Sequence, residues 1–197
     1  MHLNRPAIVT AALKLLNQYG LGDVTMRRVA TSLNAAPGAL YWHVSNKQDL
    51  IAALAEEILS PILTSEDAPS SDAVGLALSL RTELLRWRDG AEVVSAGLSQ
   101  PDSEVRAELI ELVDATCAHQ VPEASAAQLR AAAEAIVHIV LGATLLEQSQ
   151  VQMLAAESAA SVESSGTEKA DRLAAQSQSQ LVAGVDLILA GLSPNRD

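Results

Sequence analysis

Apolar residues recur every three or four positions through most of the chain, which is the spacing of an α-helix. Between residues 5 and 19 the apolar positions on one face are Ile8, Ala12, Leu15, Leu16 and Tyr19. Asn4 precedes this segment as a typical N-cap, and Gly20 follows it as a typical C-terminal stop. The pattern therefore predicts a first helix from about residue 5 to residue 19.

Two short helices follow within the next 25 residues. Thr25 is a suitable N-cap for a helix over about 25–33, and Pro37 fits the first position of a helix over about 37–43. Only three residues separate the two segments. Two helices joined by so short a break are typical of a helix-turn-helix, whose second helix enters the major groove of DNA.

The remaining pattern is also helical. Ser45 and Gln48 form a capping box that opens a helix ending near Pro61, and residues 61–71 look like a connection. Further helices are predicted over about 72–89, 91–98, 103–119, 126–154 and 167–190. Residues 155–166, rich in Ala and Ser, are interpreted as a loose linker or a frayed helix end. We therefore expect an all-α protein with a three-helix helix-turn-helix domain over residues 1–46 and a larger helical ligand-binding and dimerisation domain over 47–197.

Composition supports the helical interpretation and narrows the function classes. Of the 197 residues, 49% are hydrophobic, but there is no Phe, so Ala, Leu, Val and Ile must build the core. The longest apolar stretch, 131–146, contains Glu134 and His138, so neither a membrane span nor a membrane partner is expected. The chain opens without a secretion signal, which favours a cytoplasmic protein. A single cysteine, Cys117, excludes an internal disulfide and a cysteine-cluster metal site.

Charge is distributed unevenly along the chain. The first 50 residues carry five basic and two acidic side chains, a net charge of +3, whereas the whole chain carries −11. A basic head on an acidic body favours a polyanion partner at one end. An ordinary solvated helical surface would have a similar number of basic residues, so charge alone leaves nucleic acid binding open.

The segment 37–43 has more aromatic surface than a short helix can bury. Leu40 and Val44 can anchor it, but Tyr41, Trp42 and His43 are about 100° apart around the helix and cannot share one buried face. The candidate DNA-contacting residues are Thr25, Arg27, Arg28, Pro37, Gly38, Ala39, Tyr41, Trp42, His43 and Lys47. The alternative at this point is a plain helical bundle in which the aromatic cluster belongs to the core.

The segments 24–30, 40–44 and 46–47 resemble the TetR family of transcriptional repressors. The body segments 84–91 and 141–143 are similar to the tetracycline-repressor subgroup, and the resemblance extends over residues 3–150. It implies an all-helical homodimer that binds a palindromic operator and releases it when a small-molecule effector occupies the larger domain.

Carried over residue by residue, the positions that touch operator DNA are Arg27, Tyr41, Trp42, His43 and Lys47. At the front of the recognition helix the subgroup has a Gln, a Pro and a Thr, where this chain has residues 37–39. The amide that contacts a base edge is missing, so a different operator sequence is expected.

The resemblance also places the effector site but argues against a metal chelate. The two histidines of the subgroup's drug site align with Ile62 and Val94, and its Asn and Phe align with Leu76 and Leu80. Magnesium needs several oxygen or nitrogen ligands, which an apolar wall cannot supply. An apolar organic effector without a metal is expected, bound by Ile62, Leu76, Leu80, Trp87, Val94, Leu98, His138 and Glu147. His138 and Glu147 would orient it, although each could instead be a structural polar group.

The last two long helices are expected to form the dimer interface. Small residues such as Gly142 and Gly184 would allow close approach, and Leu129, Ile136, Val140, Leu173, Leu181, Val185 and Ile188 would supply apolar area. The alternative is that these faces pack within one chain.

The sequence thus predicts a ligand-responsive, DNA-binding transcriptional regulator, most simply a repressor. The alternatives are a transcriptional activator and a helical small-molecule-binding protein without a role at DNA. Neither an enzyme nor a bound cofactor is expected, because Cys117 lacks an obvious paired base and no phosphate-cradling Gly-rich loop or His-x-x-x-His pair occurs in the sequence.

Overall fold

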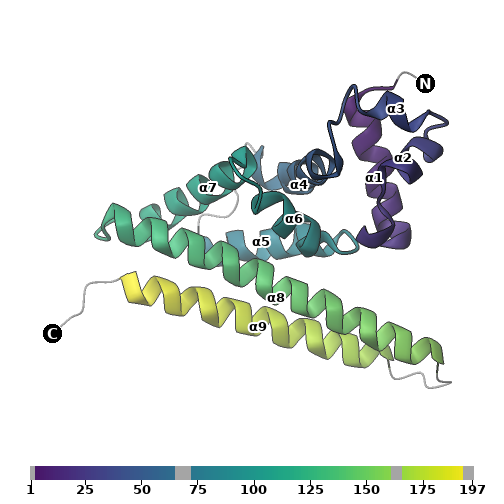
Figure 1. The fold of residues 1–197 in the computed structure, drawn as a ribbon. Coiled ribbons are helices and arrows are strands. Elements are labelled where there is room, and N and C mark those ends of the chain that lie inside the picture. The colour runs from purple at the N-terminus through teal and green to yellow at the C-terminus, as the bar shows by residue number, and fades with distance from the viewer. Residues whose placement is uncertain (1–2, 65–71, 161–165, 193–197) are drawn as a thin grey trace. The chain divides into compact units, whose positions relative to one another are not determined.

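The structure is a computed structural model that describes residues 3–64, 72–160 and 166–192 (Figure 1). These residues form helices joined by short turns and contain no β-strand, so the predicted all-α fold class is confirmed. The helices are α1 (Arg5–Tyr19), the 3-10 turn η1 (Leu21–Asp23), α2 (Met26–Ser32), α3 (Pro37–Leu40), α4 (Lys47–Leu63), α5 (Ala73–Leu85), α6 (Gly90–Leu98), α7 (Glu104–Gln120), α8 (Ala126–Ala160) and α9 (Gly166–Leu192).

The chain divides into two compact units, each built from two stretches of sequence. The first combines Met1–Thr64 with Glu83–Ala107, and the second combines Ser65–Thr82 with Glu108–Asp197. The first unit therefore contains α1 to α4 together with α6. The functional division after residue 46 remains a prediction.

In the first unit, the four N-terminal helices enclose a core of aliphatic side chains. Its fully buried members include Ile8, Leu16, Leu40, Leu50 and Leu54. The predicted cap of α1 is present, since Asn4 Oδ1 accepts a hydrogen bond from the Ala7 amide at 2.9 Å. Local capping and apolar burial together fix where these short helices begin and how they face one another.

Helix α6 packs against α4 within the first unit. A methyl group added at Gly97 would lie only 2.5 Å from Ala55 Cβ, so glycine permits the close contact between α6 and α4. Before α6, Asp89 Oδ2 accepts a hydrogen bond from the Leu21 amide at 2.8 Å, and the Arg88 amide donates to Asn17 Oδ1 at 2.9 Å. The turn before α6 is thereby fastened to the end of α1.

In the second unit, α8 and α9 lie side by side along most of their lengths (Figure 1). Gly184 of α9 faces Ile139 of α8, and a methyl group at Gly184 would come within 2.3 Å of Ile139 Cδ1. By length and composition alone, the Ala126–Glu157 part of α8 could cross a membrane, since an 18-residue window within it has a mean hydropathy of 1.6. It also carries the buried Glu147 and packs against α9, as the core helix of a soluble protein does.

Several helix ends differ from the sequence prediction. Helix α4 is capped by Asn46 rather than Ser45, and it continues through Pro61 to Leu63 because Ile62 is buried and Thr64 bonds back to the Ser60 carbonyl. Helix α5 ends at Leu85 instead of about residue 89.

Helix α8 reaches Ala160, so residues 155–160 are helical rather than a loose linker. Residues 161–165 lie outside the described part of the chain. The apolar residues Leu129, Ile136, Val140, Leu181 and Val185, which the sequence assigned to the dimer interface, are buried within a single chain.

Candidate nucleic-acid interface

The segment around α3 is held by two buried anchors. Leu40 and Val44 are fully buried, as their spacing predicted. The helix is shorter than expected, because α3 ends at Leu40 and residues 41–43 form a turn. In that turn the amides of His43 and Val44 both donate to the Leu40 carbonyl at 2.9 Å. The turn directs three successive side chains away from the core.

The outer side of this segment is exposed and strongly aromatic. The exposed fraction is 87% for Trp42 and 53% for Tyr41, and His43 is also exposed. A side chain at Gly38 would meet nothing within 4 Å, so the front of α3 is open. An exposed indole at a helix end is unusual for a soluble protein, and apolar contact with thymine methyl groups in a groove would bury it. The alternative that this aromatic cluster belongs to the core is wrong for Tyr41 and Trp42.

The basic residues near this surface differ in what they contact. Arg27 and Lys47 are exposed to solvent. Arg28 instead forms an ion pair with Asp23, and its guanidinium lies 4.4 Å from the centre of the Tyr19 ring. Thr25 caps α2 by accepting a hydrogen bond from the Arg28 amide at 3.2 Å. Thr25 and Arg28 thus have local structural partners, whereas Arg27 and Lys47 present free surface charge.

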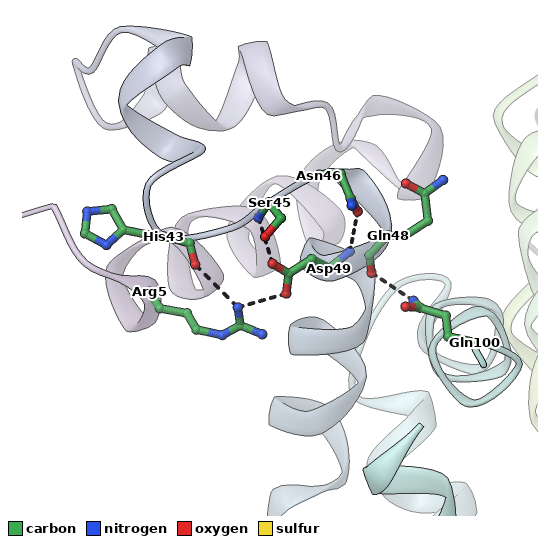
Figure 2. A network of polar contacts seen from close by, with 7 residues as sticks. All are labelled: Arg5, His43, Ser45, Asn46, Gln48, Asp49 and Gln100. Carbon is green, nitrogen blue, oxygen red and sulfur yellow. Dashed lines mark hydrogen bonds and ion pairs between the residues drawn. The ribbon is translucent and has the colours of Figure 1, made fainter. Parts of the chain in front are cut away.

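A polar network at the start of α4 contains residues that the sequence analysis did not single out (Figure 2). Asp49 accepts hydrogen bonds from the Ser45 amide at 2.7 Å and from Arg5 Nη1 at 2.8 Å. Asn46 caps the helix by accepting from the Asp49 amide at 2.9 Å. The spacing of Asn46 and Asp49 is itself a capping signal, and it lies one residue beyond the Ser45–Gln48 pair that the sequence favoured.

The carboxyl group of Asp49 is kept charged by this network. Its side chain is 25% exposed, and burial alone would raise its pKa. The hydrogen bonds from Ser45 and from the Arg5 guanidinium outweigh burial and hold the pKa of Asp49 below its ordinary value of 3.8. Asp49 is therefore an ionised acceptor throughout the neutral pH range.

The residues expected to bind an effector fall in both compact units. Ile62, Leu76, Leu80, Val94 and Leu98 are all buried. Trp87 is half-buried, and His138 is exposed on α8. The burial of these five aliphatic residues is consistent with a pocket wall and equally with ordinary core packing. His138 was expected to orient an effector in a pocket, but its side chain is exposed in the single chain.

Glu147 has a partner inside the protein. Its carboxylate is 3% exposed and forms two hydrogen bonds with the guanidinium of Arg81, which is itself buried. The same arginine donates to the carbonyl of Ala174 at 3.3 Å. The structural interpretation of Glu147, which the sequence analysis left open, therefore has direct support.

The N-terminal part of the chain matches a known family. Residues 8–54 match the model of the bacterial regulatory proteins of the tetR family. The chain is 42% identical over 96 residues to the tetracycline repressor protein class D of Escherichia coli, an alignment that covers 46% of this chain and 44% of that protein. It thus spans less than half the length of that relative. The class E repressor of Escherichia coli is 37% identical over 153 residues, or 74% of this chain and 69% of its own length.

A solved structure of similar fold contains DNA. The crystal structure of BioQ with its natural double-stranded DNA operator is 33% identical in sequence, with a TM-score of 0.69. It covers 90% of this chain and 99% of the BioQ chain. Two of these relatives are named as repressors and the third is a protein in complex with its DNA operator; none is named as an enzyme.

Proposed function

Because this chain belongs to the tetR family of bacterial regulatory proteins, we propose that it is a transcriptional regulator that binds operator DNA through α3. In this proposal the operator is palindromic, the protein acts as a repressor in the cytoplasm, and a small-molecule effector releases it from DNA. An activator would use the same surface, so the sign of regulation follows from where the operator lies relative to the promoter.

The observation that carries the proposal is the exposed aromatic surface around Trp42. The buried side chains of Leu40 and Val44 anchor residues 37–44 to the core. The absence of neighbours around Gly38 allows the backbone there to approach a DNA groove. Arg27 and Lys47 on the same unit supply charge for phosphate contacts, which position a protein on DNA without reading its sequence. A carrier of small molecules would have no use for such a surface.

We also propose a homodimer that forms through α8 and α9. In the single chain these helices expose Leu146 at 65%, Met153 at 64% and Leu187 at 74%. A groove of about 560 Å³ runs between the two helices and is lined by Leu146, Leu173 and Leu181 among polar side chains. A second copy of the same helix pair would bury the exposed Leu146 and Leu187, as the helices of a four-helix bundle do. Two recognition segments on one dimer match the two halves of a palindrome.

Sedimentation of charged variants tests the dimer. Leu146→Glu and Leu187→Glu should each shift the mass from dimer to monomer at micromolar concentration, because a buried unpaired charge is costly. Ala107→Glu places the same charge on an exposed site of α7 and should leave the mass unchanged. A wild-type monomer, or a dimer in both leucine variants, would contradict this interface.

The effector is proposed to be a largely apolar organic molecule bound without a metal ion. Support comes from the buried aliphatic residues Ile62, Leu76, Leu80, Val94 and Leu98. Of these, Ile62, Leu76 and Val94 align with polar residues of the related repressors' drug site. Glu147 is engaged by Arg81, so an effector that used this carboxylate would have to compete with the arginine. Release of DNA by small molecules, screened with and without magnesium, tests the proposal. Release that required magnesium would contradict it.

A mobility-shift assay tests the DNA-binding function itself. DNA from around the protein's own coding region is the first target, at low salt where phosphate contacts are strongest. We expect a discrete shifted band that unrelated duplex does not compete away. Failure to shift any of these fragments at low salt would contradict operator binding.

A further inference from the structure

The recognition segment is too short to fix its own orientation. Helix α3 has four residues, and its N-terminal cap residue, Ala36, makes no side-chain hydrogen bond. Between residues 37 and 44 only Leu40 and Val44 are fully buried. Two apolar anchors four residues apart define an axis about which the segment can still rock. Additional contacts are needed where the segment ends.

Asp49 supplies these contacts from the first turn of α4 (Figure 2). One carboxylate oxygen accepts from the Ser45 amide at 2.7 Å, directly after the anchor Val44. The other accepts from Arg5 Nη1 at 2.8 Å, and the same nitrogen donates to the His43 carbonyl at 3.4 Å. The carboxylate thus holds the backbone on both sides of Val44, directly at one side and through Arg5 at the other.

The position of Asp49 is itself well determined. Its amide is bound by Asn46 Oδ1 at 2.9 Å, and Leu50 beside it is fully buried. The carbonyl of Gln48 accepts a hydrogen bond from Gln100 Nε2 at 2.8 Å, which ties the start of α4 to the turn after α6 (Figure 2). A rigid helix start can therefore transmit its position to the turn that carries Trp42 and His43.

We propose that Asp49, with Arg5 as its partner, is a positioning residue for operator recognition. Their side chains bond the backbone of the segment at Ser45 and His43, and neither is among the DNA-contacting residues expected from the sequence. Asp49 orients residues 41–45 through its hydrogen bond with the Ser45 amide. Arg5 links the Asp49 carboxylate to the His43 carbonyl. The proposal rests on the proposed DNA-binding function.

Electrostatics and positioning predict opposite effects when the charge of Asp49 is removed. A carboxylate on the DNA-binding unit repels phosphates, so its neutralisation alone should tighten binding to any duplex. A positioning role requires the reverse for the operator, because a displaced recognition segment loses its base contacts. Removal of the Asp49 charge should therefore lower the affinity for operator and leave the affinity for unrelated DNA unchanged or higher.

The test is the affinity of Asp49→Asn for operator and for unrelated duplex, measured by fluorescence anisotropy at one salt concentration. We expect operator affinity to fall at least about tenfold, the factor that corresponds to one hydrogen bond to a charged group. Affinity for unrelated duplex should stay the same or rise. Glu56→Gln removes an equal charge from an exposed site on α4 and should leave operator affinity unchanged or slightly tighter.

Arg5 needs a separate experiment, because an arginine could contact phosphate directly. A phosphate contact would reduce the salt slope of binding by about one unit in Arg5→Gln, whereas positioning leaves the slope unchanged and lowers operator affinity. The double variant Arg5→Gln/Asp49→Asn should bind no more weakly than Asp49→Asn alone, since both act through one network. A full additional loss in the double variant would overturn the coupling of the two residues.

Positioning can also be measured without DNA. Amide hydrogen exchange over residues 41–45 should accelerate in Asp49→Asn and not in Glu56→Gln. The proposal is overturned if Asp49→Asn keeps wild-type exchange, if it binds operator as tightly as wild type, or if it weakens both duplexes equally. A wild-type protein that bound no DNA would contradict the proposed function instead, and the exchange data would still decide the positioning claim.

Discussion

The guanidinium of Arg81 lies side-on against the carboxylate of Glu147, with Nε 2.9 Å from Oε2 and Nη2 2.5 Å from Oε1. Both side chains are more than nine-tenths buried, and Arg81 also donates to the Ala174 carbonyl. One ion pair therefore joins α5, α8 and α9. Its two parallel hydrogen bonds satisfy charges that would otherwise be costly inside the protein.

Removal of Arg81 should destabilise the fold strongly. Arg81→Met leaves the Glu147 carboxylate buried without a partner, and the expected loss is about 3–5 kcal/mol of unfolding free energy. The measurement is urea denaturation at fixed protein concentration, because dimer stability depends on concentration. Arg81→Met/Glu147→Leu should recover most of the loss, since an apolar pair replaces the ions. A single variant as stable as wild type would show that the pair does not hold the helices together.

A substitution at Gly20 should test the junction between α1 and the turn before α6. Gly20 has φ +85°, and a methyl group there would lie 2.8 Å from the Asp89 carboxylate oxygen that binds the Leu21 amide. Gly20→Ala should lower the unfolding free energy by about 1–3 kcal/mol, the cost of a positive-φ extended conformation that is open essentially only to glycine. Gly22→Ala is the matched control, because a methyl group at Gly22 meets nothing within 4 Å. Equal losses in the two variants would contradict this assignment.

The stabilising effect of Asp49 should depend on pH. Its pKa is lower in the folded protein than the ordinary 3.8, so the charged carboxylate favours the folded state. The contribution is complete above the unfolded-state pKa and disappears as the pH falls through the folded-state pKa. The stability difference between wild type and Asp49→Asn, measured by denaturation between about pH 7 and pH 3, should therefore be constant first and shrink below about pH 4. A difference that grew on acidification would have the wrong sign.

Substitutions on the recognition surface should separate specific from general DNA contacts. Trp42→Ala and Tyr41→Ala should each weaken operator binding by about 1–3 kcal/mol with helicity and dimer mass intact. Lys47→Ala should weaken binding to every duplex and flatten the salt slope by about one unit. Lys169→Ala removes the same charge from exposed α9 and should change neither. Wild-type affinity in all three surface variants would mean that DNA is bound elsewhere.

Local signals in the sequence predicted the helix ends well where contacts between residues close in sequence determine them. The Asn4 cap, the Thr25 cap and the Gly20 stop are all present as predicted. At α4 two capping signals overlap, and the structure uses Asn46 with Asp49. The spacing of residues does not rank the two signals, and it does not show that Arg5, 44 residues away, bonds the Asp49 carboxylate.

Long-range partners account for what the sequence missed in the larger unit. The sequence left open whether Glu147 orients an effector or is a structural group, because its partner Arg81 lies 66 residues earlier in the chain. An apolar stripe does not show whether it faces its own chain or a second copy. Val140 and Val185 are buried within one chain, whereas Leu146 and Leu187, on the same two helices, are exposed. Such pairings depend on how helices cross, which helical periodicity does not specify.

The most direct test of the central claim is the fluorescence of Trp42 during a DNA titration. The chain has two tryptophans, so Trp87→Phe leaves Trp42 as the single indole. Its emission should begin at the long wavelength of an exposed indole and be quenched or blue-shifted as operator DNA is added, with saturation at one duplex per dimer and reversal by salt. Unrelated duplex should have a much smaller effect at the same concentration. Operator binding that left Trp42 emission unchanged throughout the titration would contradict recognition of DNA by α3.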